Sequence, residues 1–209
     1  MQFSTYAKPA HLIAAREFLD ASDFLLSAPK AREPVSRFSD PTNFLVAHGA
    51  ELTLKAYLSW SGMSDFDVKA LGHNLANSFQ KLKTHDPTLA KAVEEEVRTK
   101  WRNYLKAARS AQVSALADYG VTSEDYLAFL GIPSNADIGE QHPTFARDLH
   151  WLSDRHMSNG GSFRYPQFGL DSAKYIQAFG LNECTVPKTV HWGCEYLLNT
   201  LDQELRKQA

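Results

Sequence analysis

Apolar residues recur at steps of three and four along most of this chain, and that spacing is the strongest constraint on its fold. Such steps place side chains on one face of an α-helix, whereas a half-buried strand needs strict alternation. The helical pattern runs from about Pro9 to Ser27 and returns from Pro187 onward. No convincing pair of strands occurs in the sequence. We therefore expect an all-α protein, an antiparallel bundle of about six helices joined by short loops.

N-capping residues and prolines predict where several helices begin. Asp40 and Asp86 are each followed by a proline, a pair typical of an N-cap and the first helical position. They predict one helix that ends near Gly62 and a longer one that ends near Gly120. Apolar spacing predicts three further helices, around Leu75 to Leu82, Ser123 to Leu130 and Pro143 to about His156.

The longest predicted helix carries two different faces. Its expected buried seam comprises Val93, Val97, Trp101, Tyr104, Ala108 and Ala111. On another face, basic residues at steps of four, four and three should line up along solvent: Arg98, Arg102, Lys106 and Arg109. No acidic residue lies between Val97 and Leu116, so this face could contact an RNA backbone. A merely solvated face is the alternative, favoured by i,i+4 pairs such as Glu94 with Arg98.

Composition narrows the class of protein and its location. A formal net charge of -2 over 209 residues argues against a surface that binds polyanions everywhere, so a nucleic-acid contact would be a local patch. Cys184 and Cys194 match neither a paired zinc site nor a disulfide scaffold, which favours a reducing cytosol. We find no signal-peptide pattern and no membrane-span candidate. The expectation is a cytoplasmic protein with one domain over residues 1–209.

The motifs of several common enzyme classes are absent from the sequence. It has no Gly-rich phosphate loop, no GxSxG, no HExxH and no CxxC. A di-iron bundle would need Glu-x-x-His twice, and the chain has only the reversed order, once, in His48-x-x-Glu51. We therefore expect no metal and no cofactor, and no catalytic residue can be assigned with confidence.

One predicted helix is apolar on nearly all sides, yet it carries a polar stripe of His48, Glu51 and Lys55. Charges in such a helix are costly unless they are compensated. With His73 and Arg164, the stripe could form a ligand pocket between helices. The alternative is a structural Glu51–Lys55 ion pair at helical spacing beside a hydrogen-bonded His48.

Two further positions belong to this candidate pocket. His73 would lie at a helix N-terminus, where helix capping is the alternative role. Arg164 and Tyr165 precede a proline, and a planar guanidinium beside an aromatic ring suits phosphate or carboxylate recognition. For Arg164 the alternative is a loop that its side chain pins to a helix C-terminus.

Three motifs in these regions are similar to those of a known superfamily. Glu51, Lys55 and Ala56 fit a helix that reads Glu-x-x-x-Lys-Ala, and His73-Asn74-Leu75 is close to a helix-opening His-Asp-Leu. The later Phe163-Arg164-Tyr165-Pro166 looks like a motif of uncharacterised bacterial relatives. Together they resemble the HEPN superfamily (higher eukaryotes and prokaryotes nucleotide-binding), with the likeness centred on residues 40–85 and 145–166.

The resemblance implies an antiparallel helical bundle, frequently a homodimer, that acts in RNA cleavage, in nucleotide-related defence or toxin–antitoxin systems, or beside a protein partner such as a nucleotidyltransferase. Ribonucleases of this superfamily carry an arginine followed by four to six residues and a histidine. No arginine in this chain has a histidine at that distance. The resemblance therefore supports the fold more than the nuclease.

Three functional hypotheses follow. The leading one is a non-catalytic module that binds a nucleotide, RNA or a protein partner, with a site lined by His48, Glu51, Lys55, His73, Arg164 and Tyr165. The second is a metal-independent ribonuclease in which His73 is the general base and Arg164 stabilises the charge of the transition state. The third is an interaction bundle with no ligand site.

Overall fold

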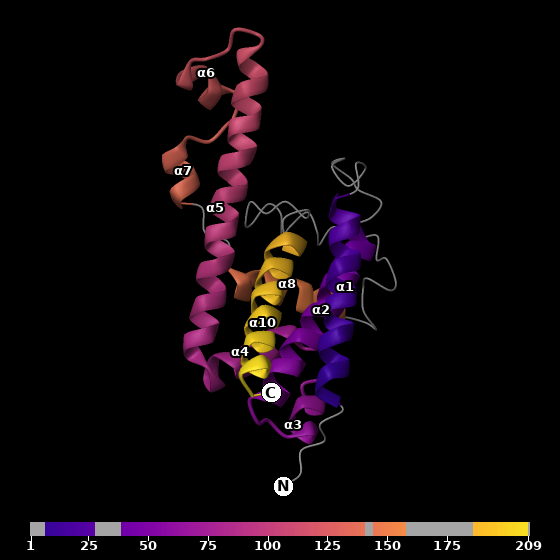
Figure 1. Cartoon of the computed structure of the whole chain (residues 1–209). Helices are drawn as coiled ribbons and strands as arrows, with labels where there is room; N and C mark the ends of the chain where they lie inside the picture. The colour runs from indigo at the N-terminus through magenta and orange to yellow at the C-terminus, as the bar shows by residue number, and fades with distance from the viewer. Residues whose placement is uncertain (1–6, 28–38, 141–143, 158–185, 209) are drawn as a thin grey trace.

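The computed structural model describes residues 7–27, 39–140, 144–157 and 186–208, and within them every regular element is an α-helix (Figure 1). Six helices have eleven residues or more: α1 (Ala7–Ser27), α2 (Ser39–Trp60), α4 (Leu75–His85), α5 (Pro87–Ala117), α8 (Phe145–Met157) and α10 (Val186–Gln208). Three have six residues each: α3 (Asp65–Ala70), α6 (Glu124–Phe129) and α7 (Asn135–Glu140). The all-α prediction is confirmed: six of the predicted helices correspond to the six long ones, and the helix predicted around Ser123 to Leu130 corresponds to the short α6.

Helix α2 lies at the centre of the bundle, with α1, α4, α8 and α10 packed around it (Figure 1). This position explains its apolar residues on nearly all sides, since each side meets a neighbouring helix. The side chains of Val46, Ala50, Leu54 and Leu58 are fully buried there. Among the described helices, none combines the length and the apolar character that crossing a membrane requires.

The second half of α5 projects beyond the bundle as an arm, accompanied by α6 and α7 (Figure 1). Val93, Val97 and Trp101 are buried, as the sequence predicts. The predicted seam is wrong beyond them, because Tyr104 is 38% exposed and Ala111 is exposed. The periodicity does place these residues on one face. Tyr104 lies at the edge of the bundle, where its ring meets Trp192 of α10, and the face then continues past the bundle toward Ala111.

Two side-chain caps tie α5, α8 and α4 together. The Glu94 carboxylate of α5 accepts hydrogen bonds from the backbone amides of Phe145 and Ala146, at 2.7 and 3.0 Å, and so caps α8. Ser153 Oγ of α8 in turn accepts from the backbone amide of Leu75, at 3.1 Å, at the start of α4. These bonds satisfy amides that a helix N-terminus leaves unpaired. They also fix the ends of three helices relative to one another.

Helices α8 and α10 make a close contact at Phe145 and Gly193. The Phe145 ring is fully buried and packs edge-on against Phe79, with 5.0 Å between ring centroids. A Cβ atom at Gly193 would lie 2.3 Å from two carbons of the Phe145 ring. The backbone of α10 can approach the ring only because residue 193 has no side chain.

A buried acid lies between the same two helices. Asp148 of α8 is 1% exposed, accepts a hydrogen bond from the Thr189 hydroxyl of α10, and accepts one from Arg147 Nε at 3.1 Å. Burial raises the pKa of this carboxyl above its usual value, although Thr189 and Arg147 act in the opposite direction; the charge of Glu94 adds to the rise. The folded state therefore binds this proton more readily than the unfolded state does.

We expect Asp148→Asn to gain stability relative to the wild type as the pH rises. A raised folded-state pKa means that the contribution of Asp148 is present below its unfolded value, about 4, and is lost as the pH rises through the folded value. Asparagine keeps the shape and the acceptor for Thr189 but does not ionise. Urea unfolding of both proteins at several pH values from about 4 to 7 measures the difference, and a difference independent of pH would contradict this assignment.

Candidate ligand site beside Glu51

The carboxylate of Glu51 is the centre of a polar network inside the bundle. Its side chain is 5% exposed and belongs to α2. Oε1 accepts a hydrogen bond from Lys55 Nζ at 2.7 Å, one helical turn further along α2. Oε2 lies 2.9 Å from His73 Nδ1, in the turn before α4, and 3.0 Å from His156 Nε2, near the end of α8. One carboxylate thus joins three parts of the fold.

These contacts keep Glu51 ionised. Burial by itself would raise its pKa, but hydrogen bonds from His156, Lys55 and His73 outweigh burial and hold the pKa well below its usual range. An ionised carboxylate only accepts hydrogen bonds, so both imidazoles donate a ring N–H to Oε2. The Glu51 carboxylate is therefore a fixed negative charge that orients two histidine rings.

His48 completes the group from the same face of α2. Its Nδ1 lies 4.0 Å from Glu51 Oε2, at the i,i+3 spacing of one helix. The ring is parallel to that of Phe44, with centroids 6.0 Å apart, and meets Phe18 edge-on at 4.4 Å. Aromatic contacts on two sides therefore hold the His48 ring beside the carboxylate.

A pocket of about 590 Å³ opens next to this network. It is lined by Ala70, Leu71, Gly72, His73, Asn74, Asn77, His156 and Met157. Gly72 has a positive φ of 57°, which allows the tight turn that presents His73. The His73 side chain is 61% exposed although its Nδ1 is bound to Glu51. The pocket is accordingly bounded on one side by the histidines that Glu51 orients.

The structure brings four of the six proposed ligand-site residues together: His48, Glu51, Lys55 and His73. Arg164 and Tyr165 lie outside the described residues. The sequence reasoning missed His156, which is buried beside Glu51. A signal for it was present, because Leu149, Leu152 and His156 follow each other at steps of three and four, and so a histidine shares the inward face of α8.

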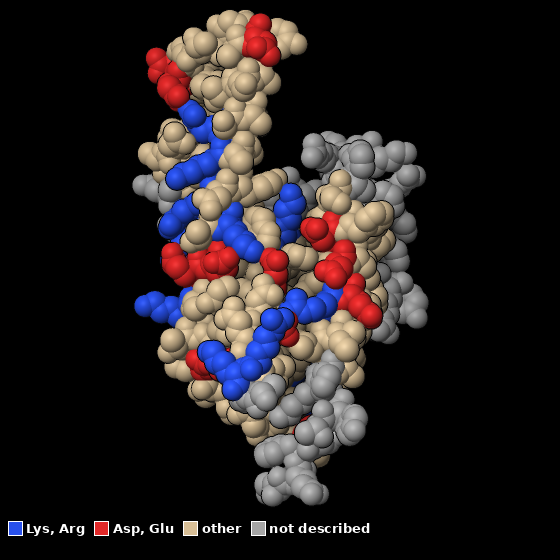
Figure 2. All heavy atoms as spheres, in the orientation of Figure 1, with Lys and Arg blue, Asp and Glu red and all other residues tan. Residues whose placement is uncertain are grey.

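The basic residues of α5 have different environments. Figure 2 shows lysine and arginine side chains along the arm, with acidic side chains near its tip. Arg98 pairs with Glu95 at 2.9 Å. The expectation that Arg109 faces solvent is wrong: its side chain is 12% exposed, it binds both carboxylate oxygens of Glu124, and its Nε donates to the Pro133 carbonyl at 2.9 Å. Arg109 therefore attaches α6 and the following loop to α5.

Replacing Arg109 with alanine should release the tip of the arm. Nη2 of Arg109 contacts both carboxylate oxygens of Glu124, fifteen positions away, and hydrogen bonds between charged groups are stronger than neutral ones. We expect faster amide exchange over residues 118–134 with little change in the bundle, measured by hydrogen exchange with mass spectrometry. Lys106→Ala, at an exposed position of the same arm, is the matched control. Equal exchange in the two variants would mean that Arg109 does not hold α6.

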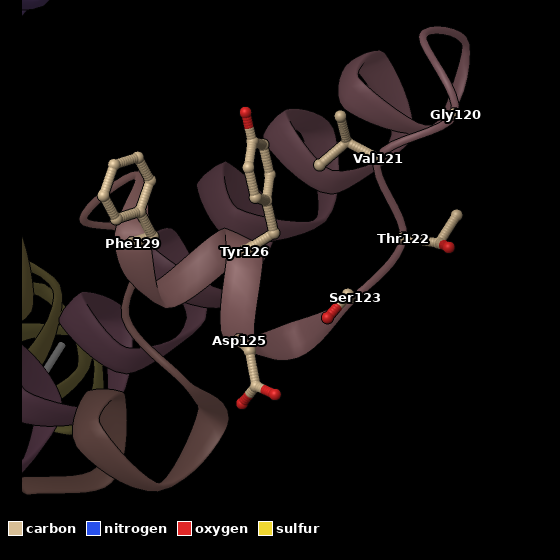
Figure 3. A pocket seen from close by; sticks show the side chains of 7 residues that line it. All are labelled: Gly120, Val121, Thr122, Ser123, Asp125, Tyr126 and Phe129. Carbon is tan, nitrogen blue, oxygen red and sulfur yellow. The ribbon is translucent and has the colours of Figure 1, made fainter.

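A second hollow, of about 690 Å³, lies at the tip of the arm (Figure 3). Tyr126 and Phe129 of α6 project on one side, with ring centroids 5.9 Å apart, and Asp125 points to the other. Its lining holds one carboxylate and no histidine, cysteine, lysine or arginine. It therefore offers no pair of groups for acid–base or metal chemistry, in contrast to the pocket beside His73.

Comparison with known proteins identifies no relative: no family model matches the chain, no curated protein matches its sequence and no solved structure matches its fold. Inferences about function consequently depend on the residues and geometry of the chain itself.

Proposed function

We propose that this protein is a HEPN-like helical module that binds a nucleotide or a short RNA segment in the pocket beside His73, without cleaving RNA through the usual motif of that superfamily. The observation that carries the proposal is the convergence of the ionised Glu51 with His73 and His156 at the wall of this pocket. Its volume of about 590 Å³ is typical of small-molecule sites.

The pocket lining offers groups that suit a nucleobase and a sugar. The side-chain amides of Asn74 and Asn77 and the ring of His73 can donate or accept hydrogen bonds, and Met157 adds apolar surface. The backbone amide of Asn77 is already bound to Asn74 Oδ1 at 2.8 Å, and that of Leu75 to Ser153. These amides are therefore not available to a phosphate, and the proposal assigns phosphate contact to Arg164.

Binding of a nucleotide panel and of short single-stranded RNAs, measured by calorimetry in EDTA, tests the proposal. We expect His73→Ala and Asn77→Ala to weaken binding at least about tenfold, equivalent to about 1.4 kcal/mol for each lost contact. His85→Ala is the matched control, because this exposed histidine lies at the far end of α4. The proposal fails if no nucleotide or RNA binds, or if His73→Ala binds as well as the control.

A second candidate, a metal-independent ribonuclease, is favoured by the hydrogen bond between Glu51 and His73. This bond holds the ring proton on Nδ1, so Nε2 can act as a general base. The His73 side chain is 61% exposed, so Nε2 can be reached by a substrate. Cleavage of total RNA and tRNA in EDTA that is lost in both His73→Ala and Arg164→Ala would establish it. If the wild type cleaves neither substrate, the binding module remains as the proposal.

The proposal includes a cytoplasmic location, inferred from the two cysteines and from the sequence without a signal-peptide pattern. The HEPN resemblance adds self-association, or association with a protein such as a nucleotidyltransferase. Sedimentation equilibrium of the purified protein tests the homodimer, and a monomer at all concentrations would remove self-association from it.

A further inference from the structure

We propose that His48, Glu51 and His156 form a binding site for a divalent transition-metal ion of the Zn²⁺ class. Each of the three side chains offers one ligand atom, and these atoms all lie within 4.8 Å of one another. The sequence alone argued against a metal, because it showed only the pair His48-x-x-Glu51 on one helix. The third ligand comes from α8, and only the fold brings it to the other two.

The spacing of the ligand atoms is close to what a metal ion requires. Bonds of about 2.0 to 2.1 Å in tetrahedral geometry place neighbouring ligand atoms roughly 3.3 Å apart. Glu51 Oε2 lies 3.0 Å from His156 Nε2 and 4.0 Å from His48 Nδ1. All three ligand atoms lie within 4.8 Å of one another, so His48 would have to move closer to the other two. Two imidazoles and one carboxylate are a donor set that Zn²⁺ commonly uses, with a fourth position left for water or a ligand.

The surroundings would hold these ligands in place. Glu51 and His156 are buried, and both helices that carry the three ligands are packed in the core. Lys55 binds the other carboxylate oxygen and His73 contacts Oε2. Such outer contacts orient metal ligands and help to set their basicity. The positive charge of Lys55 opposes a cation, so we expect weaker binding than at a site without it.

Metal binding requires one rearrangement of a proton. In the structure His156 donates its Nε2–H to Glu51, and a metal needs the lone pair of that nitrogen. A neutral ring would move this proton to Nδ1, whereas a doubly protonated ring would release it to solvent. In both cases Oε2 would exchange this hydrogen bond for the metal. Without an ion, the same residues hydrogen-bond one another as a purely structural network. The experiment must distinguish this alternative from a metal site.

The experiment titrates the full chain, first treated with EDTA and then freed of it, with Zn²⁺ and with Co²⁺. We expect one ion per chain by elemental analysis, a higher melting temperature, and the visible absorption bands of four-coordinate Co²⁺. His48→Ala and His156→Gln should lose the bands and the stoichiometric ion. Glutamine can still donate a hydrogen bond to Glu51, so His156→Gln should stay folded by circular dichroism while it loses a metal ligand.

His150→Ala is the control variant, because His150 lies on α8 but is 67% exposed and pairs with Asp154. Uptake equal to the wild type in this control, together with loss in the two ligand variants, supports the site. No stoichiometric uptake by the wild type, or equal uptake by all four proteins, overturns it. The metal site does not depend on the proposed nucleotide site, because nucleotide binding is measured in EDTA. Either kind of binding can be absent while the other is observed.

Discussion

Gly193→Ala is expected to lower the free energy of unfolding by about 3 kcal/mol, even though alanine is the better helix former. The added methyl group would lie 2.3 Å from Cδ2 and from Cε2 of Phe145. Phe145 is fully buried and already contacts Phe79, so its ring cannot move without disturbing the core. Cores packed at this density transmit such a displacement rather than absorb it.

Gly49→Ala is the matched comparison for this substitution. A Cβ atom at Gly49 would lie 2.9 Å from Cδ2 and 3.0 Å from Cγ of Leu19, a smaller overlap than the 2.3 Å contacts at Gly193. Both glycines are buried inside helices, so the gain in helix propensity of about 1 kcal/mol applies to each. We therefore expect Gly49→Ala to cost less than Gly193→Ala in urea unfolding. Equal losses in the two variants would show that the Phe145 contact does not decide the effect.

Glu51→Ala should also cost about 3 kcal/mol, because it removes the acceptor that three donors share. His156 is buried and its Nε2–H would be left unpaired, while Lys55, 16% exposed on its side chain, would keep a charge with no partner. A buried donor without an acceptor costs about 1 to 3 kcal/mol by itself. Urea unfolding in EDTA measures the loss without a contribution from metal ions.

The control for Glu51 is Glu95→Ala, which removes an acid from an exposed ion pair. Glu95 contacts Arg98 at 2.9 Å, but its side chain is 57% exposed, and such pairs contribute about 0 to 1 kcal/mol. A loss at Glu51 no larger than the loss at Glu95 would mean that the network is not what fixes α2, α4 and α8 together.

The long helices and several of their ends could be predicted from the sequence because both are local properties; the six-residue α3 and α7 were not predicted. The pair Asp86 and Pro87 begins α5, with Asp86 Oδ1 accepting from the Leu89 amide at 2.9 Å, and Gly62 follows the end of α2 with a φ of 98°. The polar stripe of α2 could also be predicted, since i,i+3 and i,i+4 positions share a helical face.

What could not be predicted depends on contacts between distant segments. His156 meets Glu51 across 105 positions, and no spacing in the sequence marks that distance. The prediction that the α5 seam is buried along its whole length was wrong for a related reason. Tyr104 and Ala111 do lie on the face that Val97 begins, but periodicity cannot tell whether another helix covers a face along its whole length.

The cap that Glu94 places on α8 determines the direction in which His156 points. An α-helix of 13 residues turns as one body, so the rotation fixed at Phe145 is the rotation found at the other end. If Glu94 bound the backbone amides one residue further along α8, every α8 side chain would rotate by about 100° around the helix axis. His156 would then leave Glu51, although neither residue had changed. A carboxylate on α5 thus helps to set the direction in which His156 and Met157 point at the opposite end of α8.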